Sequence, residues 1–300
     1  MKAGFVSLVG RPNAGKSTLL NALVGQKLAI VSDKPQTTRH RIQGVRNTPG
    51  GQIVFIDTPG IHKPGHRMNR RMVDTALGAL RDVDLVVLVV DAALPWGSGD
   101  RFVLDLVGTS GSKALLVLNK IDRVLPREKL LPLIARYAQA FAFTAIVPTS
   151  ATSGEGLPAL ESEILAALPE GEVLFPADYL TDQTERLLAA ELIREKVLHH
   201  TRDELPYTTA VVIDAFEEPA SPGAITKIFA SILVDHDSQK PIVVGKAGAM
   251  IKRIGTEARR DLEEMLDGRV HLDLHVKVRE DWRDNERVLD DIGLGRKKGT

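Results

Sequence analysis

The chain has 300 residues, of which 43% are hydrophobic, and it carries equal numbers of basic and acidic residues, 39 each. This length and apolar content are enough for two domains with separate cores. The absence of cysteine excludes disulfides, iron–sulfur clusters and thiolate zinc sites, and it fits a reducing compartment, so we expect a cytoplasmic protein. The longest apolar run, Leu85–Val90, is too short to cross a bilayer, and the first residues lead into a strand rather than a signal peptide.

Residues 3–165 alternate short β-branched runs with helical stretches. The predicted strands cover residues 5–9, 41–46, 53–56, 85–90, 114–118 and 145–147. Most of them are apolar throughout, which is typical of a mostly parallel sheet with helices on both faces. The connection Thr48–Gly51 is so short that the two strands it joins must pair antiparallel. We therefore predict an α/β domain with a mixed, mostly parallel sheet.

The first predicted strand runs into the segment Gly10-Arg-Pro-Asn-Ala-Gly15-Lys16-Ser17, and a helical stretch follows it. This is the P-loop pattern in its strand, loop, helix context. Successive backbone N–H groups at a helix N-terminus form a concave anion site, and glycines permit the backbone that this needs. Lys16 is expected to reach the β- and γ-phosphates, and the Ser17 hydroxyl to bind Mg²⁺. A chance glycine-rich turn is the alternative, which the flanking elements disfavour.

A second motif, Asp57-Thr-Pro-Gly60, follows the predicted strand over residues 53–56. Beside a P-loop, Asp57 is expected to hold Mg²⁺ through water, and the Gly60 N–H to bond the γ-phosphate. Between the two motifs lies the polar segment Lys34-Pro-Gln-Thr37-Thr38-Arg39, from which a threonine can reach the metal and the γ-phosphate. We favour Thr38 over Thr37, although the spacing leaves both open.

The segment Asn119-Lys120-Ile-Asp122 comes at the end of the predicted strand over residues 114–118 and is typical of a guanine-binding loop. One carboxylate can accept both the N1–H and the 2-amino group of guanine, whereas adenine offers an acceptor at N1 and no 2-amino group. Asp122 is therefore expected to select GTP over ATP. Lys120 can lie along the base, and Asn119 can tie this loop to the P-loop. Thr149-Ser-Ala151 follows the last strand, where a backbone N–H can donate to guanine O6.

The composition changes after the helical stretch 157–168. Pro169-Glu-Gly171 is followed by a weakly periodic segment, so we predict a first domain over residues 1–170, a linker over 171–182 and a second domain over 183–300. The first 170 residues carry about six excess positive charges and the remainder about six excess negative charges. The second domain is predicted to contain a helix over 183–200 and strands over 208–216 and 226–234.

A predicted strand, Ile242–Val244, leads into Gly245-Lys246-Ala247-Gly248 and a helix over 249–266, and a strand over 270–278 follows. Such a turn permits close approach of a nucleic-acid backbone, and the helix N-terminus favours phosphate. From Lys240 to Arg260 the basic residues face a single acid, Glu257, within a domain that is net acidic. They are Lys240, Lys246, Lys252, Arg253, Arg259 and Arg260. The alternative is a solvated basic helix face.

The set Gly10–Ser17, Gln36-Thr-Thr-Arg-His40, Asp57–Gly60 and Asn119–Asp122 resembles the Era family of bacterial GTPases, and the second half resembles a type II KH domain, the other hallmark of that family. The resemblance spans nearly the whole chain. It implies switch loops at Lys27–Ile42 and Gly60–Met72, which change order with the γ-phosphate.

The sequence and this resemblance together give a set of candidate site residues. Catalytic roles are expected for Lys16, Thr38 and Gly60, and metal binding for Ser17, Thr38 and Asp57. The expected GTP contacts are Gly10, Asn13, Ala14, Gly15, Lys16, Ser17, Thr18, Asp57, Gly60, Asn119, Lys120, Asp122, Ser150 and Ala151. The expected RNA contacts are Gly245, Lys246, Ala247, Gly248, Lys252 and Arg253.

The residue after Gly60 is Ile61, where Ras-like enzymes carry a catalytic glutamine. An aliphatic side chain cannot orient water, so slow intrinsic hydrolysis is expected. Asn13 has two interpretations of equal weight. Related GTPases with asparagine at this position use it to hold K⁺, and the alternative is a side chain that stabilises the loop.

The resemblance implies a cytoplasmic, monomeric GTPase that binds GTP, GDP and Mg²⁺, and 16S ribosomal RNA near its 3′ end, and that acts in assembly of the small ribosomal subunit. It also implies peripheral contact with the inner membrane. Two other hypotheses are an RNA-binding assembly factor in which nucleotide is mainly structural, and a P-loop ATPase or small-molecule kinase. A GTPase switch requires RNA affinity that depends on the bound nucleotide, whereas an assembly factor with a structural nucleotide does not. Asp122 argues against the ATPase or kinase.

Overall fold

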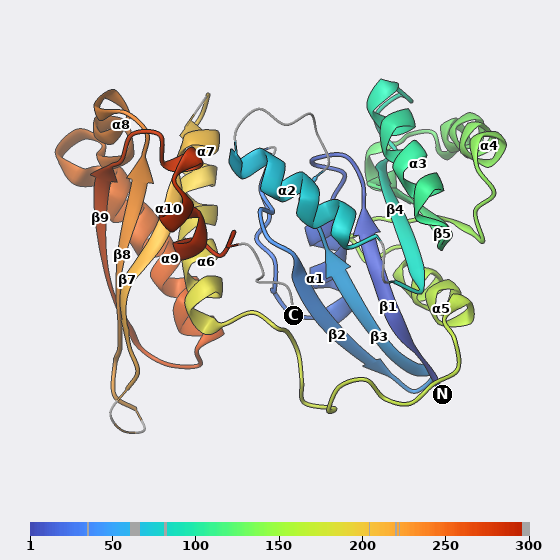
Figure 1. The fold of residues 1–300 in the computed structure, drawn as a ribbon, viewed down its shortest axis with the longest axis horizontal. Helices are drawn as coiled ribbons and strands as arrows, with labels where there is room; N and C mark the ends of the chain where they lie inside the picture. The colour runs from blue at the N-terminus through green and yellow to red at the C-terminus, as the bar shows by residue number, and fades with distance from the viewer. Residues whose placement is uncertain are drawn as a thin grey trace. The chain divides into compact units, whose positions relative to one another are not determined.

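The computed structural model describes residues 1–34, 36–60, 67–80, 83–203, 205–219, 221 and 223–295. The chain forms two compact units that divide between Asp182 and Gln183 (Figure 1). Residues 61–66, in the first half of the second predicted switch loop, lie outside the described residues, as does the charged end of the chain at 296–300.

The first unit contains a six-stranded sheet in the order β2-β3-β1-β4-β5-β6. Its strands are β1 (Lys2–Val9), β2 (Ile42–Thr48), β3 (Gly51–Asp57), β4 (Leu85–Asp91), β5 (Lys113–Asn119) and β6 (Ile146–Pro148). Only the pair formed by β2 and β3 is antiparallel, and the others are parallel. The predicted mixed, mostly parallel sheet is confirmed.

Helices cover both faces of this sheet. They are α1 (Lys16–Val24), α2 (Arg67–Gly78), α3 (Ser98–Ser110), α4 (Leu130–Ala140) and α5 (Leu157–Ala167). Alternate residues of β4 belong to different cores: Val87 packs with Leu19 of α1, and Val86 packs with Val103 of α3. Burial of each such side chain contributes about 1.5–3 kcal/mol. This is why the strands of the sequence are apolar throughout and show no alternation.

The segment over residues 171–182, expected to be a linker, is bound along the first unit. The fully buried Gln52 of β3 accepts hydrogen bonds from the N–H groups of Leu174 and Phe175 at 2.8 and 2.9 Å. Farther on, Val45 N donates to Leu180 O at 2.8 Å, beside an antiparallel bridge between Gly44 and Thr181. The segment therefore extends the edge of the sheet at β2.

The second unit contains a three-stranded sheet in the order β7-β8-β9. Its elements are α6 (Glu185–His200), α7 (Leu205–Thr208), β7 (Ala210–Glu217), β8 (Thr226–Val234), α8 (Lys240–Val244), α9 (Ala249–Met265), β9 (Val270–Val278) and α10 (Glu286–Asp291). β7 and β8 pair antiparallel, whereas β8 and β9 pair parallel. Thr184 begins α6 by accepting a hydrogen bond from Leu187 N at 3.3 Å. Apolar side chains of α6 and α9 share one core with the sheet.

The prediction of a strand at Ile242–Val244 is wrong, because these residues end helix α8. Their β-branched side chains favour a strand, but Pro241 stands in the first turn, where its fixed φ suits a helix. Val243 is fully buried in the core whereas Ile242 is 53% exposed. The turn Gly245–Gly248 thus connects two helices rather than a strand and a helix.

Candidate functional site: a nucleotide site and a helix groove

The predicted P-loop connects β1 to α1, and its shape needs both of its glycines. Gly15 has a φ of +95°, in the left-handed region, and a Cβ there would lie 2.3 Å from Asn119 Nδ2. A Cβ on Gly10 would lie 2.3 Å from the carbonyl oxygen of Val89. No side chain fits at either position. The loop therefore packs its backbone directly against the ends of β4 and β5.

Lys16 lies inside this loop. Its side chain is buried, and Nζ donates to the carbonyl oxygens of Gly10 and Arg11 at 3.3 and 3.2 Å. Burial lowers the pKa of Lys16, while the carboxylate of Asp57 raises it. A desolvated ammonium held by carbonyl groups is a strong partner for an incoming phosphate, because little water has to be removed from it.

Three predicted metal ligands meet beside Lys16. Ser17 Oγ lies 2.6 Å from Thr38 Oγ1 and donates to Asp57 Oδ2 at 2.7 Å, and Thr38 Oγ1 lies 3.4 Å from the same carboxylate oxygen. Asp57 is fully buried, and burial raises its pKa against the opposing effect of Lys16. Its other oxygen, Oδ1, has no hydrogen-bond partner. A buried carboxylate with one free oxygen, beside two hydroxyl groups, fits a hard divalent cation.

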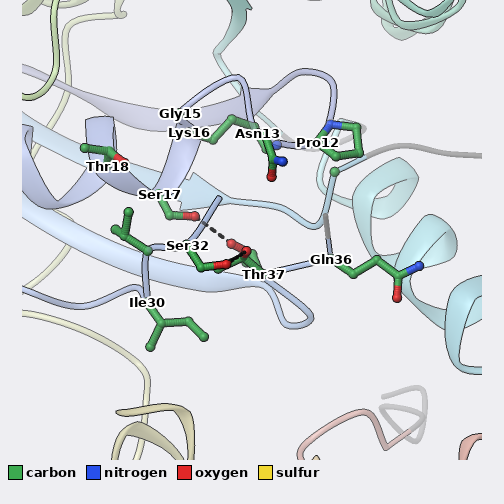
Figure 2. A pocket seen from close by; sticks show the side chains of 13 residues that line it. Pro12, Asn13, Gly15, Lys16, Ser17, Thr18, Ile30, Ser32, Gln36 and Thr37 are labelled. Carbon is green, nitrogen blue, oxygen red and sulfur yellow. Dashed lines mark hydrogen bonds between the residues drawn. The ribbon is translucent and has the colours of Figure 1, made fainter. Parts of the chain in front are cut away.

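Thr37 and Thr38 differ in the direction of their hydroxyl groups, and this decides which of them can bind the metal. Thr37 Oγ1 donates to Lys34 O at 2.5 Å and lies 2.8 Å from Ser32 Oγ, within its own loop. Thr38 faces Ser17 instead. In Figure 2, Ser17 extends from the start of α1 toward this loop, and Lys16 and Asn13 line the same pocket. The geometry favours Thr38 as the metal ligand.

Gly60, at the start of the predicted second switch loop, and Asn13, of the P-loop, both line the pocket. A Cβ on Gly60 would lie 2.8 Å from the Cα of Pro12, so the Gly60 backbone lies against the P-loop. Asn13 has a φ of 62°, and its Nδ2 donates to the carbonyl oxygen of Asp33 at 2.7 Å. Asn13 thus joins the P-loop to the predicted first switch loop, a contact that fits the loop-stabilising interpretation, while K⁺ binding by Asn13 stays a prediction.

The predicted guanine-binding loop is tied to the P-loop by two side chains. Asn119 Nδ2 donates to Ala14 O at 3.0 Å, and its Oδ1 accepts from Ala151 N at 3.1 Å. Lys120 Nζ donates to Asn13 O at 2.5 Å. Asp122 stands exposed in a 3₁₀ turn, Ile121–Arg123, with its carboxylate available to a base. The base loop and the phosphate loop are therefore parts of one site.

The last predicted base contacts, Ser150 and Ala151, lie beside this loop. The Ser150 N–H donates to Glu155 O at 2.9 Å, and the Ala151 N–H is bound by Asn119. In this structure both amides donate to groups of the protein and so stabilise the loop that follows β6. Thr18 follows Ser17 on α1 and lines the same pocket.

Sequence reasoning missed two carboxylates of this site. Asp91, the last residue of β4, lies 2.7 Å from Lys120 Nζ, and Asp100 of α3 lies 2.9 Å from Arg11 Nη1 in the P-loop. Asp91 ends an apolar strand, as Asp57 does, and that position is the signal that could have identified it. Asp100 lies within a helix, and nothing in the sequence distinguishes it.

In the second unit, the turn Gly245–Gly248 begins helix α9 with an unusual backbone. Gly245, Ala247 and Gly248 all have positive φ values, 74°, 49° and 79°. A Cβ on Gly245 would lie 2.5 Å from Met250 Cβ, whereas the space around Gly248 is open. The Gly248 side of the turn is thus the side that a nucleic-acid backbone can approach.

A groove follows this turn between α9 and β9. Lys252, Thr256 and Arg259 of α9 line it on one side, and Leu272 and Leu274 of β9 on the other. All six basic side chains predicted to form a stripe are exposed. The groove combines positive charge with an apolar floor, which suits phosphates and the faces of unstacked bases. Leu272 and Leu274 were not predicted as contacts.

One acid, Glu257, and a histidine share the surroundings of Arg253. Its Nε donates to Glu257 Oε1 at 3.1 Å, and Glu257 Oε2 lies 2.7 Å from His200 Nε2 at the end of α6. The hydrogen bond to His200, followed by that to Arg253, lowers the pKa of Glu257. The Arg253 guanidinium is therefore already paired, and Lys252 is the freer of the two toward the groove.

Two families match parts of the chain: 50S ribosome-binding GTPases match residues 5–120, and KH domains match residues 204–283. The chain is 50% identical to GTPase Era of Geobacter metallireducens over 292 residues, 97% of each protein. It is 46% identical to GTPase Era of Heliobacterium modesticaldum, over 99% of this chain and 98% of that one.

Two crystal structures are similar along nearly the whole chain. One is Era in complex with MgGDPNP and nucleotides 1506–1542 of 16S ribosomal RNA, with 42% identity, a TM-score of 0.94, and coverage of 98% of this chain and 99% of that one. The other is a variant of Aquifex aeolicus Era bound to GDP and AlF4⁻, with 42% identity, a TM-score of 0.94, and coverage of 98% and 100%.

Proposed function

Because this chain belongs to the Era family of GTPases, we propose that it is a GTP-driven switch that binds 16S ribosomal RNA near its 3′ end during assembly of the small ribosomal subunit. The observation that carries this proposal is the presence of two sites in one chain. A guanine-nucleotide site lies in the first unit, and a KH groove with exposed basic residues lies in the second. The related Era structure contains both a GTP analogue and 16S RNA.

In this proposal the P-loop amides and Lys16 bind the phosphates, and Asp122 binds the edge of guanine. Ser17, Thr38 and Asp57 would hold Mg²⁺, since they already converge and one Asp57 oxygen is without a partner. Bound Mg²⁺ supplies positive charge that offsets the charge of the phosphates. Gly60 is placed against the P-loop, where its N–H can donate to the γ-phosphate.

Hydrolysis is proposed to be slow without a partner. The position after Gly60 carries an isoleucine, which lies outside the described residues and has no group that can orient water. Lys16 and the P-loop amides stabilise charge on the phosphates but do not position the attacking water. A residue from a partner, or a backbone group, would have to do so.

A K⁺ ion bound by Asn13 is the proposed source of additional positive charge near the γ-phosphate. Asn13 donates through Nδ2 to Asp33 O, and its remaining amide atom, Oδ1, is the kind of oxygen that binds K⁺. With K⁺ in place of Na⁺ at equal ionic strength, we expect about tenfold faster GTP turnover, as expected for one added charge near the γ-phosphate. Phosphate release measured in the two salts tests this, with Asn13→Ala as the variant that should lose the difference. Equal rates would leave Asn13 with its loop-stabilising role alone.

The switch requires that RNA affinity depend on the bound nucleotide. We expect the GTP-analogue form to bind a single-stranded RNA with the sequence of the 16S 3′ end about tenfold more tightly than the GDP form, within the usual range of coupling. Fluorescence anisotropy with labelled RNA measures both constants. Equal affinities would instead support an RNA-binding factor in which nucleotide is structural.

A substitution in the turn tests the groove itself. Gly248→Asp should weaken RNA binding by at least about tenfold, because a carboxylate would face the phosphates. Gly223→Asp is a matched control: both glycines have φ values near 80° and open space for a Cβ, 79° and 82°, so the backbone strain is similar. The groove assignment is wrong if the two variants bind RNA equally well.

We also propose a cytoplasmic monomer. Among the described residues no helix is both long and apolar enough to span a bilayer. Peripheral contact with the inner membrane is part of the proposal, and it would not use the apolar side of α6. Leu192, Ile193 and Val197 of that helix are buried in the core of the second unit.

A further inference from the structure

The ammonium of Lys120 is held by a carboxylate that lies outside every nucleotide motif of the sequence. Asp91 Oδ2 lies 2.7 Å from Lys120 Nζ, and the two side chains are only 12% and 20% exposed. The same Nζ donates to the P-loop carbonyl of Asn13. A single ammonium thus connects the end of β4, the base loop and the P-loop.

The direction of the Asp91 carboxylate is set by the backbone around it. Its Oδ1 accepts from Ala93 N at 3.0 Å, which leaves Oδ2 facing Lys120. Asp91 pairs in register with Asn119 of β5, and Ala92 N donates to Asn119 O at 2.8 Å. The carboxylate and the base loop are therefore fixed on neighbouring strands before any nucleotide binds.

Lys120 needs such an anchor. Its φ is 63°, a value that is unfavourable for a residue with a side chain, and its long side chain would lose much rotamer entropy if it became ordered only on binding. The stem passes close to Gly15, where a Cβ would lie 3.7 Å from Lys120 Cε. An ordered stem in this place offers a preformed surface to the purine, which lowers the entropy cost of binding.

We propose that Asp91 is a positioning residue for the guanine nucleotide, acting through Lys120. The inference rests on the assignment of Lys120 to the base site in the proposed function. It concerns affinity and not the chemical step, because the two side chains contact each other, the Ala93 N–H and the carbonyl oxygen of Asn13, and not the side chains of Lys16, Ser17 or Thr38.

The test begins with Asp91→Asn, which keeps an oxygen for the Ala93 N–H but turns a neutral amide toward the ammonium. We expect GDP to bind about tenfold more weakly and the KM for GTP to rise by a similar factor, as for loss of one charge-assisted hydrogen bond, with kcat unchanged. Asp91→Glu restores the charge and should recover most of the affinity. A variant that is merely misfolded in part would lower the active fraction, and so the apparent kcat, without raising KM.

Asp84→Asn is the matched control. Asp84 stands just before the opposite end of β4, where its Oδ2 accepts from Phe5 N at 2.8 Å. This variant also removes one carboxylate and weakens one hydrogen bond next to the same strand, but far from the base loop along β4. Its GDP affinity and KM should match those of the unaltered protein.

A double-mutant cycle with Lys120→Met separates the possible failures. If Asp91 acts through Lys120, Asp91→Asn should have almost no further effect on GDP affinity in the Lys120→Met background. An equal, additive loss in that background would overturn the positioning role, as would a single variant with unchanged GDP affinity. A Lys120→Met variant that binds GDP normally would instead contradict the assignment of Lys120 to the base site.

Discussion

The Asp122→Asn variant is expected to lose its preference for GTP and to bind xanthosine triphosphate instead. Asp122 is exposed in a short 3₁₀ turn that directly follows Lys120, so its carboxylate can reach the purine edge without strain. Guanine presents N1–H and an amino group to that carboxylate, whereas xanthine carries an oxygen where guanine has the amino group. The ratio of the two affinities should change by roughly 10³-fold or more, because the wrong base leaves polar groups unpaired.

Competition between the two triphosphates for a fluorescent nucleotide measures this ratio. Glu128→Gln, which neutralises an exposed acid in the following 3₁₀ turn, is the matched control and should leave GTP preferred. Thermal unfolding should be nearly unchanged in both variants, because neither side chain is part of a core. A variant of Asp122 that still prefers GTP would show that another group recognises the base.

Thr38→Ala is expected to slow GTP hydrolysis by about 100-fold, in the range for loss of one group that acts on the reacting phosphate. Thr38 Oγ1 lies 2.6 Å from Ser17 Oγ and faces Asp57, so its removal takes away a ligand of the proposed metal site. GDP affinity should change little, because GDP has no γ-phosphate for this threonine to sense. Single-turnover hydrolysis and GDP titration give the two quantities.

Thr37→Ala is the natural comparison, since it removes the same atoms from the neighbouring residue. Thr37 contacts Ser32 and Lys34 within its own loop, and its loss should lower hydrolysis by only a few-fold through a looser switch loop. If Thr37→Ala hydrolysed GTP more slowly than Thr38→Ala, Thr37 and not Thr38 would be the metal ligand. Similar, small effects of both variants would mean that neither threonine binds the metal.

Much of the nucleotide site could be predicted because its parts follow strands of a parallel sheet. The P-loop follows β1, Asp57 ends β3 and the base loop follows β5, so the topology alone brings them to one edge. The chemistry of each motif then indicates which part of GTP it meets. The family resemblance drawn from these motifs is confirmed by relatives that match almost the whole chain.

Other features were beyond sequence reasoning, each for a physical reason. The helix at Lys240–Val244 is five residues long, and over so short a segment β-branched composition outweighs the periodicity that distinguishes a helix from a strand. The binding of residues 171–182 along the first unit depends on hydrogen bonds to Gln52 of β3 and to Val45 of β2, which lie more than 100 residues earlier. No local pattern records such a partner.

The sequence by itself determined the class of fold, the GTPase family and the order of the nucleotide-binding motifs along the chain. These follow from spacing within short segments, because a P-loop or a guanine-binding loop is built from neighbouring residues. The tertiary structure alone decided which threonine faces Ser17, which carboxylate holds Lys120, and which leucines form the floor of the KH groove. Each of those contacts joins residues from different elements, and the direction of a side chain across such a contact is set by packing and not by the residues beside it.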